Sequence, residues 1–351
     1  GLHLVGTGPF VFVEWIRGDR VVLRRNPDYA WAPPLVKNSG PAHLEEVVFR
    51  FLPNDSDRTS SLEEGEADAV FYVPPADVAR LRENSEFQIQ VWPVRGVPVS
   101  MMMNVARRPT DDPSVRRAIS HALDRDRLVK EIFHGEFPRA YGPLSQFSLA
   151  YNPAVERVYP FDLELARRLL AEAGWRDLDG DGVLEKEGEK LALVFLAIPF
   201  NYYTRFGQFV RESLAEIGAV VEVRTLSPVE WMLAAQRGEH NLVPQGKFAS
   251  APQILGYVYH SRHSLGGYGW SKRPAHYPAG LDDLLERGGR LLDMSEYVPL
   301  YQKAQEIIMD EALAAPLHCN TNIVAVRKGI SGLSFDAIGA YPFLHDVTVE
   351  A

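Results

Sequence analysis

The feature that most constrains this fold is an alternation of apolar strands and amphipathic helices in the second half of the chain. An unbroken apolar run at 191–198 is typical of a strand buried on both faces. Residues 205–217 repeat apolar side chains at helical spacing, and a second apolar strand follows at 220–223. Ser227-Pro228-Val229-Glu230 then has the pattern of a capping box, which predicts the start of another helix. This order predicts an α/β fold whose parallel strands are joined by helices.

Turn and capping residues predict the other elements. Gly18-Asp19 between two apolar runs predicts a β-hairpin with a two-residue turn. Further strands are expected at 47–51, 68–71, 322–326 and 346–349. Helices are expected at 55–64, from Asp112 and Asp162 as N-caps, and over about 281–292 and 296–311. The order strand 47–51, helix 55–64, strand 68–71 favours a parallel pair with a right-handed crossover.

Length and composition restrict the class of protein. A chain of 351 residues exceeds the usual size of one core, so two lobes are expected. The 46 acids outnumber the 37 bases, which gives a formal charge of −9 and argues against nucleic acid as a partner. Apolar runs of membrane-spanning length are absent, and the single Cys319 excludes an internal disulfide. These values are typical of a globular protein.

Five sequence blocks resemble, in the same order, those of the peptide/nickel-type (family 5) extracellular solute-binding proteins of ABC importers. Each block is weak by itself, but together they extend over nearly the whole chain. The blocks are Gly6-Thr7-Gly8-Pro9-Phe10 with Arg24-Arg25-Asn26-Pro27-Asp28-Tyr29, Asp112 to Ile119 with Ala122 to Arg125, Ala166 to Trp175, Gln302 to Ile308, and Val324 to Gly329.

The resemblance implies an α/β, two-lobe periplasmic-binding-protein-like (type II) fold with mixed sheets and crossover helices. Lobe I would comprise residues 1–99 and 320–351, and lobe II residues 100–319. In the family a long stretch precedes the opening block, so we expect this chain to be a C-terminal portion that lacks much of lobe I. The resemblance also implies that a ligand is enclosed between the lobes and that ABC permease subunits are the partners. It implies an extracytoplasmic location, with or without a lipid anchor. We expect a monomer.

Candidate ligand-binding residues lie where a strand passes into a helix. Tyr202, Tyr203 and Arg205 follow the apolar strand 191–198, where backbone N–H groups at a helix start favour carboxylates. Arg205 is expected to pair with a ligand carboxylate. The alternative is an exposed arginine beside tyrosines that pack on the lobe surface.

Further candidates lie in two loops and one strand. Lys247 and Gln253 flank the segment around Pro252, which resembles the family segment that supplies an acid for a peptide's amino group. This segment contains no acidic residue, so the identity of the ligand stays open. The candidates are a differently anchored peptide, an oligosaccharide or another polar solute. Tyr268 and Trp270 lie in a glycine-rich loop, and Asn104 ends a methionine-rich strand that is either core or cleft wall.

The loop from Asp177 to Glu185 is the sharpest local motif. Asp177, Asp179 and Asp181 alternate, and a glycine occupies the sixth position, as in the first half of a calcium-binding loop. Glycine replaces the usual glutamate at the twelfth position, and Glu185 is the candidate substitute. The loop is therefore either a structural calcium site or an Asp/Gly surface turn.

The sequence favours a receptor over an enzyme. It contains no nucleophile elbow, phosphate loop or zinc-protease motif. We therefore expect no catalytic residues and no cofactor other than the candidate structural calcium. The alternatives are a hydrolase acting on peptides or oligosaccharides and a sensor domain without a permease.

Overall fold

The computed structural model describes residues 4–34, 36–199, 202–262 and 278–350. The chain divides into two compact units, residues 1–92 with 321–351 and residues 93–320. The expected lobes divide at 99/100 and 319/320, so the structure moves the first boundary seven residues toward the N-terminus. The reason is that strand β6 (Gly96–Met103) belongs as a whole to the sheet of the second unit.

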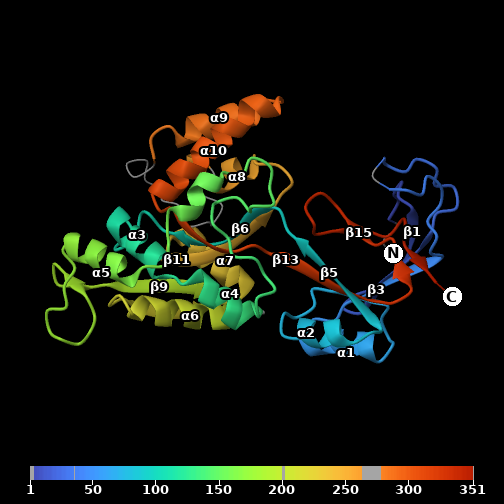
Figure 1. Ribbon diagram of the computed structural model, residues 1–351, viewed down its shortest axis with the longest axis horizontal. Coiled ribbons are helices and arrows are strands. Elements are labelled where there is room, and N and C mark those ends of the chain that lie inside the picture. Colours follow the sequence, from blue (N-terminus) through green and yellow to red (C-terminus); the bar gives the residue numbers. More distant parts are fainter. Residues whose placement is uncertain (1–3, 35, 200–201, 263–277, 351) are drawn as a thin grey trace. The chain divides into compact units, whose positions relative to one another are not determined.

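The first unit holds two three-stranded sheets. One has the order β1-β2-β3, and the other has the order β4-β13-β5. Short helices and two small ladders, β14-β17 and β15-β16, complete the unit (Figure 1). The elements are β1 (Phe10–Ile16), β2 (Arg20–Arg25), β3 (Glu46–Arg50), α1 (Asp55–Glu63), β4 (Ala69–Phe71), α2 (Val78–Glu83), β5 (Phe87–Pro93), β13 (Thr321–Arg327), β14 (Ile330–Ser331), β15 (Ser334–Phe335), β16 (Pro342–Phe343) and β17 (Thr348–Val349).

Two local predictions for the first unit need correction. The hairpin β1-β2 forms, but its loop has three residues, with Gly18 at φ +79° and the Asp19 N–H donating to the Ile16 carbonyl at 3.0 Å. The expected parallel pairing of β3 with β4 is wrong. Each joins a different sheet, and each pairs antiparallel, β3 with β2 and β4 with β13. The partner of β3 is the preceding strand β2, whereas the partner of β4 is β13, which lies far along the chain, and the spacing of β3 and β4 does not reveal either pairing.

The second unit is built on one mixed sheet of order β10-β9-β11-β6-β12. Strand β9 runs parallel to β10 and β11, while β6 runs antiparallel to β11 and β12. Its elements, after β6, are α3 (Pro113–Ala122), α4 (Arg125–Phe133), the 3-10 helix η1 (Pro153–Arg157), α5 (Leu163–Glu172), β7 (Glu185–Lys186), β8 (Glu189–Lys190), β9 (Ala192–Ala197), α6 (Tyr203–Ala215), β10 (Val220–Thr225), α7 (Pro228–Arg237), β11 (Leu242–Phe248), α8 (Ile254–Tyr259), α9 (Leu281–Arg290), α10 (Met294–Asp310) and β12 (Ala314–His318).

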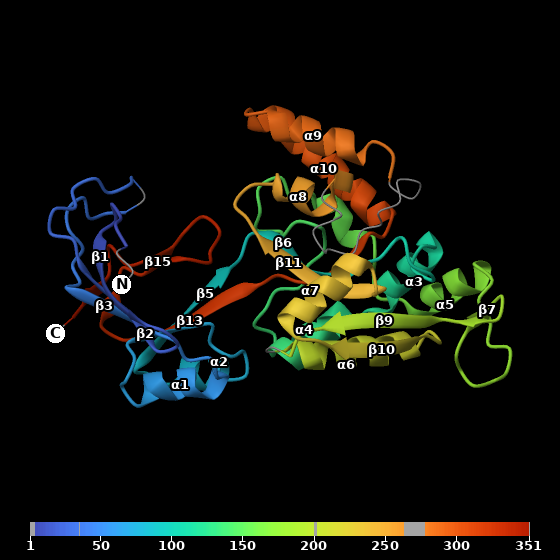
Figure 2. The ribbon, with the colours of Figure 1, turned by 180° about the vertical axis from the view of Figure 1, so that it is seen from behind.

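The predicted alternation of strands and helices is confirmed here. Helix α6 joins the parallel strands β9 and β10 and lies along both (Figure 2). Gly207 on α6 permits this close approach, because a Cβ there would lie 2.8 Å from Val223 Cγ1. The predicted caps are also present. Asp112 accepts from the Ser114 N–H, and Ser227 and Glu230 form the capping box at the start of α7.

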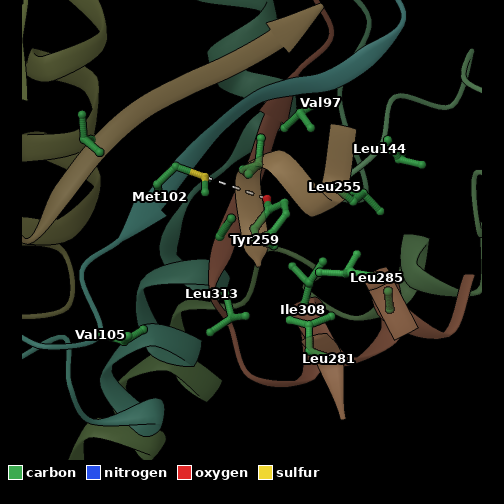
Figure 3. Close-up of a cluster of buried hydrophobic side chains, with 14 of the residues drawn as sticks. Val97, Met102, Val105, Leu144, Leu255, Tyr259, Leu281, Leu285, Ile308 and Leu313 are labelled. Carbon is green, nitrogen blue, oxygen red and sulfur yellow. Dashed lines mark hydrogen bonds between the residues drawn. The ribbon is translucent and has the colours of Figure 1, made fainter. Parts of the chain in front are cut away.

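One hydrophobic core cluster of the second unit lies between the sheet and helices α8, α9 and α10. Tyr259 and Tyr301 are fully buried in it, and the Tyr259 hydroxyl approaches Met102 Sδ at 3.9 Å (Figure 3). Met101, Met102 and Met103 are at most 1% exposed. The methionine-rich strand β6 is therefore part of the core. Among the described residues, no helix is long and apolar enough to cross a membrane.

Candidate functional site

A concavity of about 380 Å³ opens in the second unit beside the carboxyl ends of three strands. Its walls come from the residues that follow β9, from β11, from β6 and from the residues after β12. Helices α6 and α7 contribute their first turns. Ten of the described residues line it, namely the aromatic Tyr202, Tyr203, Trp231 and Phe248, the aliphatic Val99, Ile198 and Pro244, the amides Gln245 and Asn320, and Gly246. Ligands of α/β sheets commonly bind beyond the carboxyl ends of the strands.

The sheet is irregular where the concavity forms. On the β11 side of β6, Gln245 pairs with Ser100 but Lys247 pairs with Val97, so two residues of β6 oppose one of β11. On the other side, Pro316 pairs with Ser100 and His318 pairs with Val99, which leaves one extra residue on β12. Irregular ladders of this kind redirect side chains and are frequent beside binding sites.

Two stacked tyrosines form one wall. The rings of Tyr202 and Tyr203 lie 5.1 Å apart at an interplanar angle of 21°. Tyr202 packs edge-on against Phe133 of α4, with 4.8 Å between centroids, and against His318, with 5.6 Å. Burial raises the pKa of both phenols, so both hydroxyls stay neutral at physiological pH.

His318 supports this wall from inside the unit. Its side chain is fully buried, and neither ring nitrogen has a hydrogen-bond partner among the described residues. The ring of Phe133 lies 4.2 Å from it, and Phe137 and Phe206 complete an aromatic cage. Burial lowers the pKa of His318 to about 3, so the imidazole is neutral.

The opposite wall comes from α7 and β11. The indole Nε1 of Trp231 donates to the Leu196 carbonyl at 3.4 Å, which ties the ring to the end of β9. Phe248, at the end of β11, is 46% exposed. Between them, Gly246 leaves space for the amide of Asn320, since a Cβ at Gly246 would lie 3.3 Å from Asn320 Nδ2.

The structure brings two of the predicted binding residues, Tyr202 and Tyr203, to the concavity. Arg205 is exposed on the first turn of α6 and donates to the Glu131 carbonyl at 2.6 Å instead of reaching the concavity. Lys247 lies on β11 between two lining residues but does not line the concavity itself. Gln253 is exposed at the start of α8.

Asn104 has a structural role and does not line the concavity. It lies just after β6, at the other end of the sheet, where it is 3% exposed. Its amide donates to the carbonyls of Gly238 at 3.3 Å and His240 at 2.9 Å, and its side-chain oxygen accepts from the Ala106 N–H at 3.0 Å. Tyr268 and Trp270 lie outside the described residues.

The other eight lining residues, among them Trp231, Phe248 and Asn320, were not predicted from the sequence as binding residues. The signal that marked the tyrosines also applies to Trp231, which lies in the first turn of the helix after β10. Asn320 follows β12 in the same manner. Asn320 could be predicted to line the concavity only if the pairing of β12 with β6 were known, and the sequence does not show that pairing.

The acidic loop of the second unit brings three carboxylates together. One oxygen from each of Asp177, Asp179 and Asp181 lies within 4.8 Å of the others, and all three side chains are exposed. The Lys190 ammonium pairs with Asp181 and approaches Asp179 at 4.0 Å. The hydrogen bond from Lys190 lowers the pKa of Asp181. Glu185 lies outside this group and pairs through its backbone with Arg176.

These donors suit calcium in type, but they supply three of the six to eight oxygens that calcium takes, and a lysine competes for them. The calcium site therefore stays a prediction.

The chain divides into two compact units, and the second is an α/β unit with the concavity beside the carboxyl ends of its strands. Residues 1–269 match the family described as "Bacterial extracellular solute-binding proteins, family 5 Middle", and the chain belongs to this family. It is 26% identical to a dipeptide-binding protein of Escherichia coli, over 99% of this chain and 62% of the relative. It is 27% identical to the oligopeptide-binding protein AppA of Bacillus subtilis, over 94% of this chain and 59% of the relative.

Solved structures give the same fold, that of type II periplasmic binding proteins. NikA from Brucella suis in complex with Fe(III)-EDTA matches with a TM-score of 0.84 at 22% identity, over 98% of this chain and 68% of that one. DppA from Helicobacter pylori in complex with peptide STSA matches with a TM-score of 0.77 at 25% identity, over 99% of this chain and 63% of that one. The chain thus spans about three fifths of the length of the curated relatives it matches.

Proposed function

We propose that this chain belongs to the solute-binding receptor of an ABC importer, which binds a peptide or similar polar solute outside the cytoplasm and delivers it to permease subunits in the membrane. Membership of the extracellular solute-binding family supports both the location outside the cytoplasm and the role as a solute-binding receptor. Relatives named for dipeptides, oligopeptides and glutathione support a peptide-like solute.

The observation that carries the proposal is the concavity at the carboxyl ends of β9, β11 and β12. Aromatic faces and two amide side chains suit the recognition of a small organic solute, because ligand sites combine apolar walls with a few polar groups. Binding in such a site stabilises whichever conformation holds the solute more tightly, and a receptor signals its loaded state in this manner.

The same lining supports binding in preference to catalysis. Among the described residues, the lining contains no carboxylate, thiol or imidazole, which are the groups that commonly act as general acids and bases in hydrolysis. A hydrolase on this fold would need such groups beside the bound solute. We therefore propose that the solute leaves the protein chemically unchanged.

The segment around Pro252 supports a second feature of the solute. Ala251 and Gln253 flank Pro252 and are exposed, and neither carries a charge. Burying an ammonium group without a partner costs several kcal/mol. We therefore propose that the receptor discriminates little between a peptide with a free amino terminus and its acetylated form.

The test is native mass spectrometry of the purified protein, followed by calorimetry with the released compound and with free and acetylated peptides. We expect a bound small molecule that is recovered intact. Conversion of the compound to products would favour the hydrolase. A preference for the free amine above about a hundredfold, or about 2.7 kcal/mol, would contradict indifference to acetylation but not the receptor function.

A further inference from the structure

The described residues that line the concavity carry no formal charge. All ten lining residues are aromatic, aliphatic, amide or glycine, and no arginine, lysine, aspartate or glutamate of the described residues is among them. Arg205, the nearest arginine in the sequence to the tyrosine wall, donates to the Glu131 carbonyl. A charged group that entered this concavity would lose its hydration without gaining an opposite charge from the lining, and such transfers are strongly unfavourable.

The aromatic walls are held in fixed positions. Tyr202 is packed against Phe133 and His318, and Tyr203 is stacked on Tyr202. The Trp231 indole is tied to the Leu196 carbonyl. Rigid aromatic side chains offer a large contact area at little cost in conformational entropy, so a flat ring gains more from them than a flexible chain does.

Asn320 provides a polar group within these walls. Its backbone carbonyl accepts from the Val94 N–H at 2.8 Å, which fixes the residue. No hydrogen bond among the described residues uses its side chain. The amide therefore keeps both its donor and its acceptor capacity, and it approaches the space that the absent side chain of Gly246 leaves open.

We propose that this concavity receives an uncharged ring-shaped group of the solute, whose polar edge hydrogen-bonds to the Asn320 side chain. The group is the aromatic side chain of a peptide or the ring of a sugar, which share flat apolar faces and uncharged polar edges. This inference rests on the proposed receptor function and names the part of the solute that this unit recognises.

Blocked tripeptides of sequence acetyl-Ala-X-Ala-amide test the inference, because they differ only in the central side chain. Isothermal titration calorimetry with the purified protein compares tyrosine, leucine, aspartate and lysine at X, and a separate arm uses cellobiose. We expect the tyrosine peptide or cellobiose to bind at least about thirtyfold more tightly than the aspartate and lysine peptides. The ligand that binds more tightly identifies the source of the ring.

A charge introduced at Asn320 provides the matched variant. Asn320→Asp preserves size and places a carboxylate at the polar end of the concavity. It should raise the affinity for the lysine peptide at least tenfold and lower that for the aspartate peptide. Phe161→Ala is the control, since Phe161 is exposed and does not line the concavity, and it should change neither affinity. Circular dichroism verifies that both variants are folded.

The outcomes separate this inference from the receptor function. Equal affinity for the tyrosine, aspartate and lysine peptides, or an Asn320→Asp variant that binds all ligands as the wild type does, overturns the inference. So does the failure of both the tyrosine peptide and cellobiose to bind. In each case a compound recovered by native mass spectrometry would still support the receptor, whereas its absence would count against the receptor itself.

Discussion

The two ends of the five-stranded sheet each carry an asparagine, and the structure uses them in opposite ways. At the amino end, where β9 and β11 begin, Asn104 is buried and its side chain makes three hydrogen bonds to the backbone. At the carboxyl end, Asn320 lines the concavity, and among the described residues no hydrogen bond uses its side chain. The same residue type thus stabilises the fold at one end and is available to a ligand at the other.

The residues around the two asparagines differ in the same way, with hydrogen-bonded amides at the amino end and aromatic side chains at the carboxyl end. Near Asn104, the side chain of Asn241 accepts from the Val194 N–H at 3.0 Å and donates to the Arg108 carbonyl at 2.9 Å. This closed network satisfies buried backbone groups. The carboxyl end instead has two irregular ladders and a group of aromatic side chains. Substitutions should therefore affect stability at the amino end and binding at the carboxyl end.

The largest expected effect is the loss of stability in Asn104→Leu. Removing the amide breaks three hydrogen bonds and leaves the carbonyls of Gly238 and His240 without this donor. At about 1 kcal/mol for each bond, the free energy of unfolding should fall by about 3 kcal/mol. Urea unfolding measures it. A loss below about 1 kcal/mol would contradict the structural role of the amino end.

The second prediction concerns pH and the carboxyl end. His318 has a pKa of about 3 in the folded protein, because it is buried, against about 6.5 in the unfolded chain. The unfolded chain therefore binds the proton first, so the stability is fully present above pH 6.5 and is lost as the pH falls toward 3. At pH 5 this histidine should cost about 2 kcal/mol.

Urea unfolding of wild type and His318→Leu at pH 8 and pH 5 measures this contribution. The variant should lose less stability between the two values, by about 2 kcal/mol. His43→Gln is the control for the loss of one histidine, because His43 is exposed. Identical pH dependence in wild type and His318→Leu would refute the assignment.

The third prediction tests the acidic loop, which precedes β9 at the amino end. If the loop binds calcium, a concentration tenfold above the dissociation constant should stabilise the protein by about 1.4 kcal/mol. Asp179→Asn combined with Asp181→Asn should abolish the effect. Lys190→Met should strengthen it, since the lysine competes for the same oxygens. Thermal unfolding with calcium and with chelator decides it, and equal melting temperatures in the two conditions would exclude a structural calcium.

The fourth prediction concerns Gly246→Ala, which adds a methyl group between β6 and the Asn320 amide at the carboxyl end of the sheet. In Gly246→Ala the Cβ would lie 3.2 Å from Val99 Cγ2 and 3.3 Å from Asn320 Nδ2. We expect a loss of about 1 kcal/mol in stability from the crowding. The affinity for the tyrosine peptide or for cellobiose, whichever binds the wild type more tightly, should fall as well. Wild-type affinity in this variant would show that the position of Asn320 does not matter.

The smallest expected effect on stability is that of Asn320→Ala. No hydrogen bond among the described residues uses this side chain, so its removal should change the free energy of unfolding by less than about 0.5 kcal/mol. Urea unfolding beside Asn104→Leu gives the direct contrast. A loss as large as that of Asn104→Leu would remove the distinction between the two ends.

Much of the local structure follows from the sequence. The apolar run at 191–198, the helical repeat at 205–217 and the capping box at Ser227 predict β9, α6 and the start of α7, because each pattern is complete within a short segment. The tyrosines of the concavity were predicted for the same reason, since they occupy the junction of one strand with the next helix. Membership of the family was also visible in short blocks of sequence.

Pairing between distant segments could not be predicted in this way. The spacing of β3 and β4 predicted that they pair, yet β3 pairs with β2 and β4 pairs with the distant β13. Asn104 and not Asn320 was predicted to be a binding residue, since nothing local distinguishes two asparagines that follow apolar strands. Arg205 was assigned to a ligand, and the structure directs it to a carbonyl of α4.

The sequence by itself thus determined the class of fold, the alternation of β9, α6, β10 and α7, and the family, because hydrophobic periodicity and capping act between near neighbours. Tertiary structure decided which side chains meet. The antiparallel placement of β6 between β11 and β12 puts Val99, Gly246 and Asn320 together, although they are far apart in the chain. The physical reason is that a polar group is satisfied or left available by its neighbours in space, and strand pairing sets these neighbours.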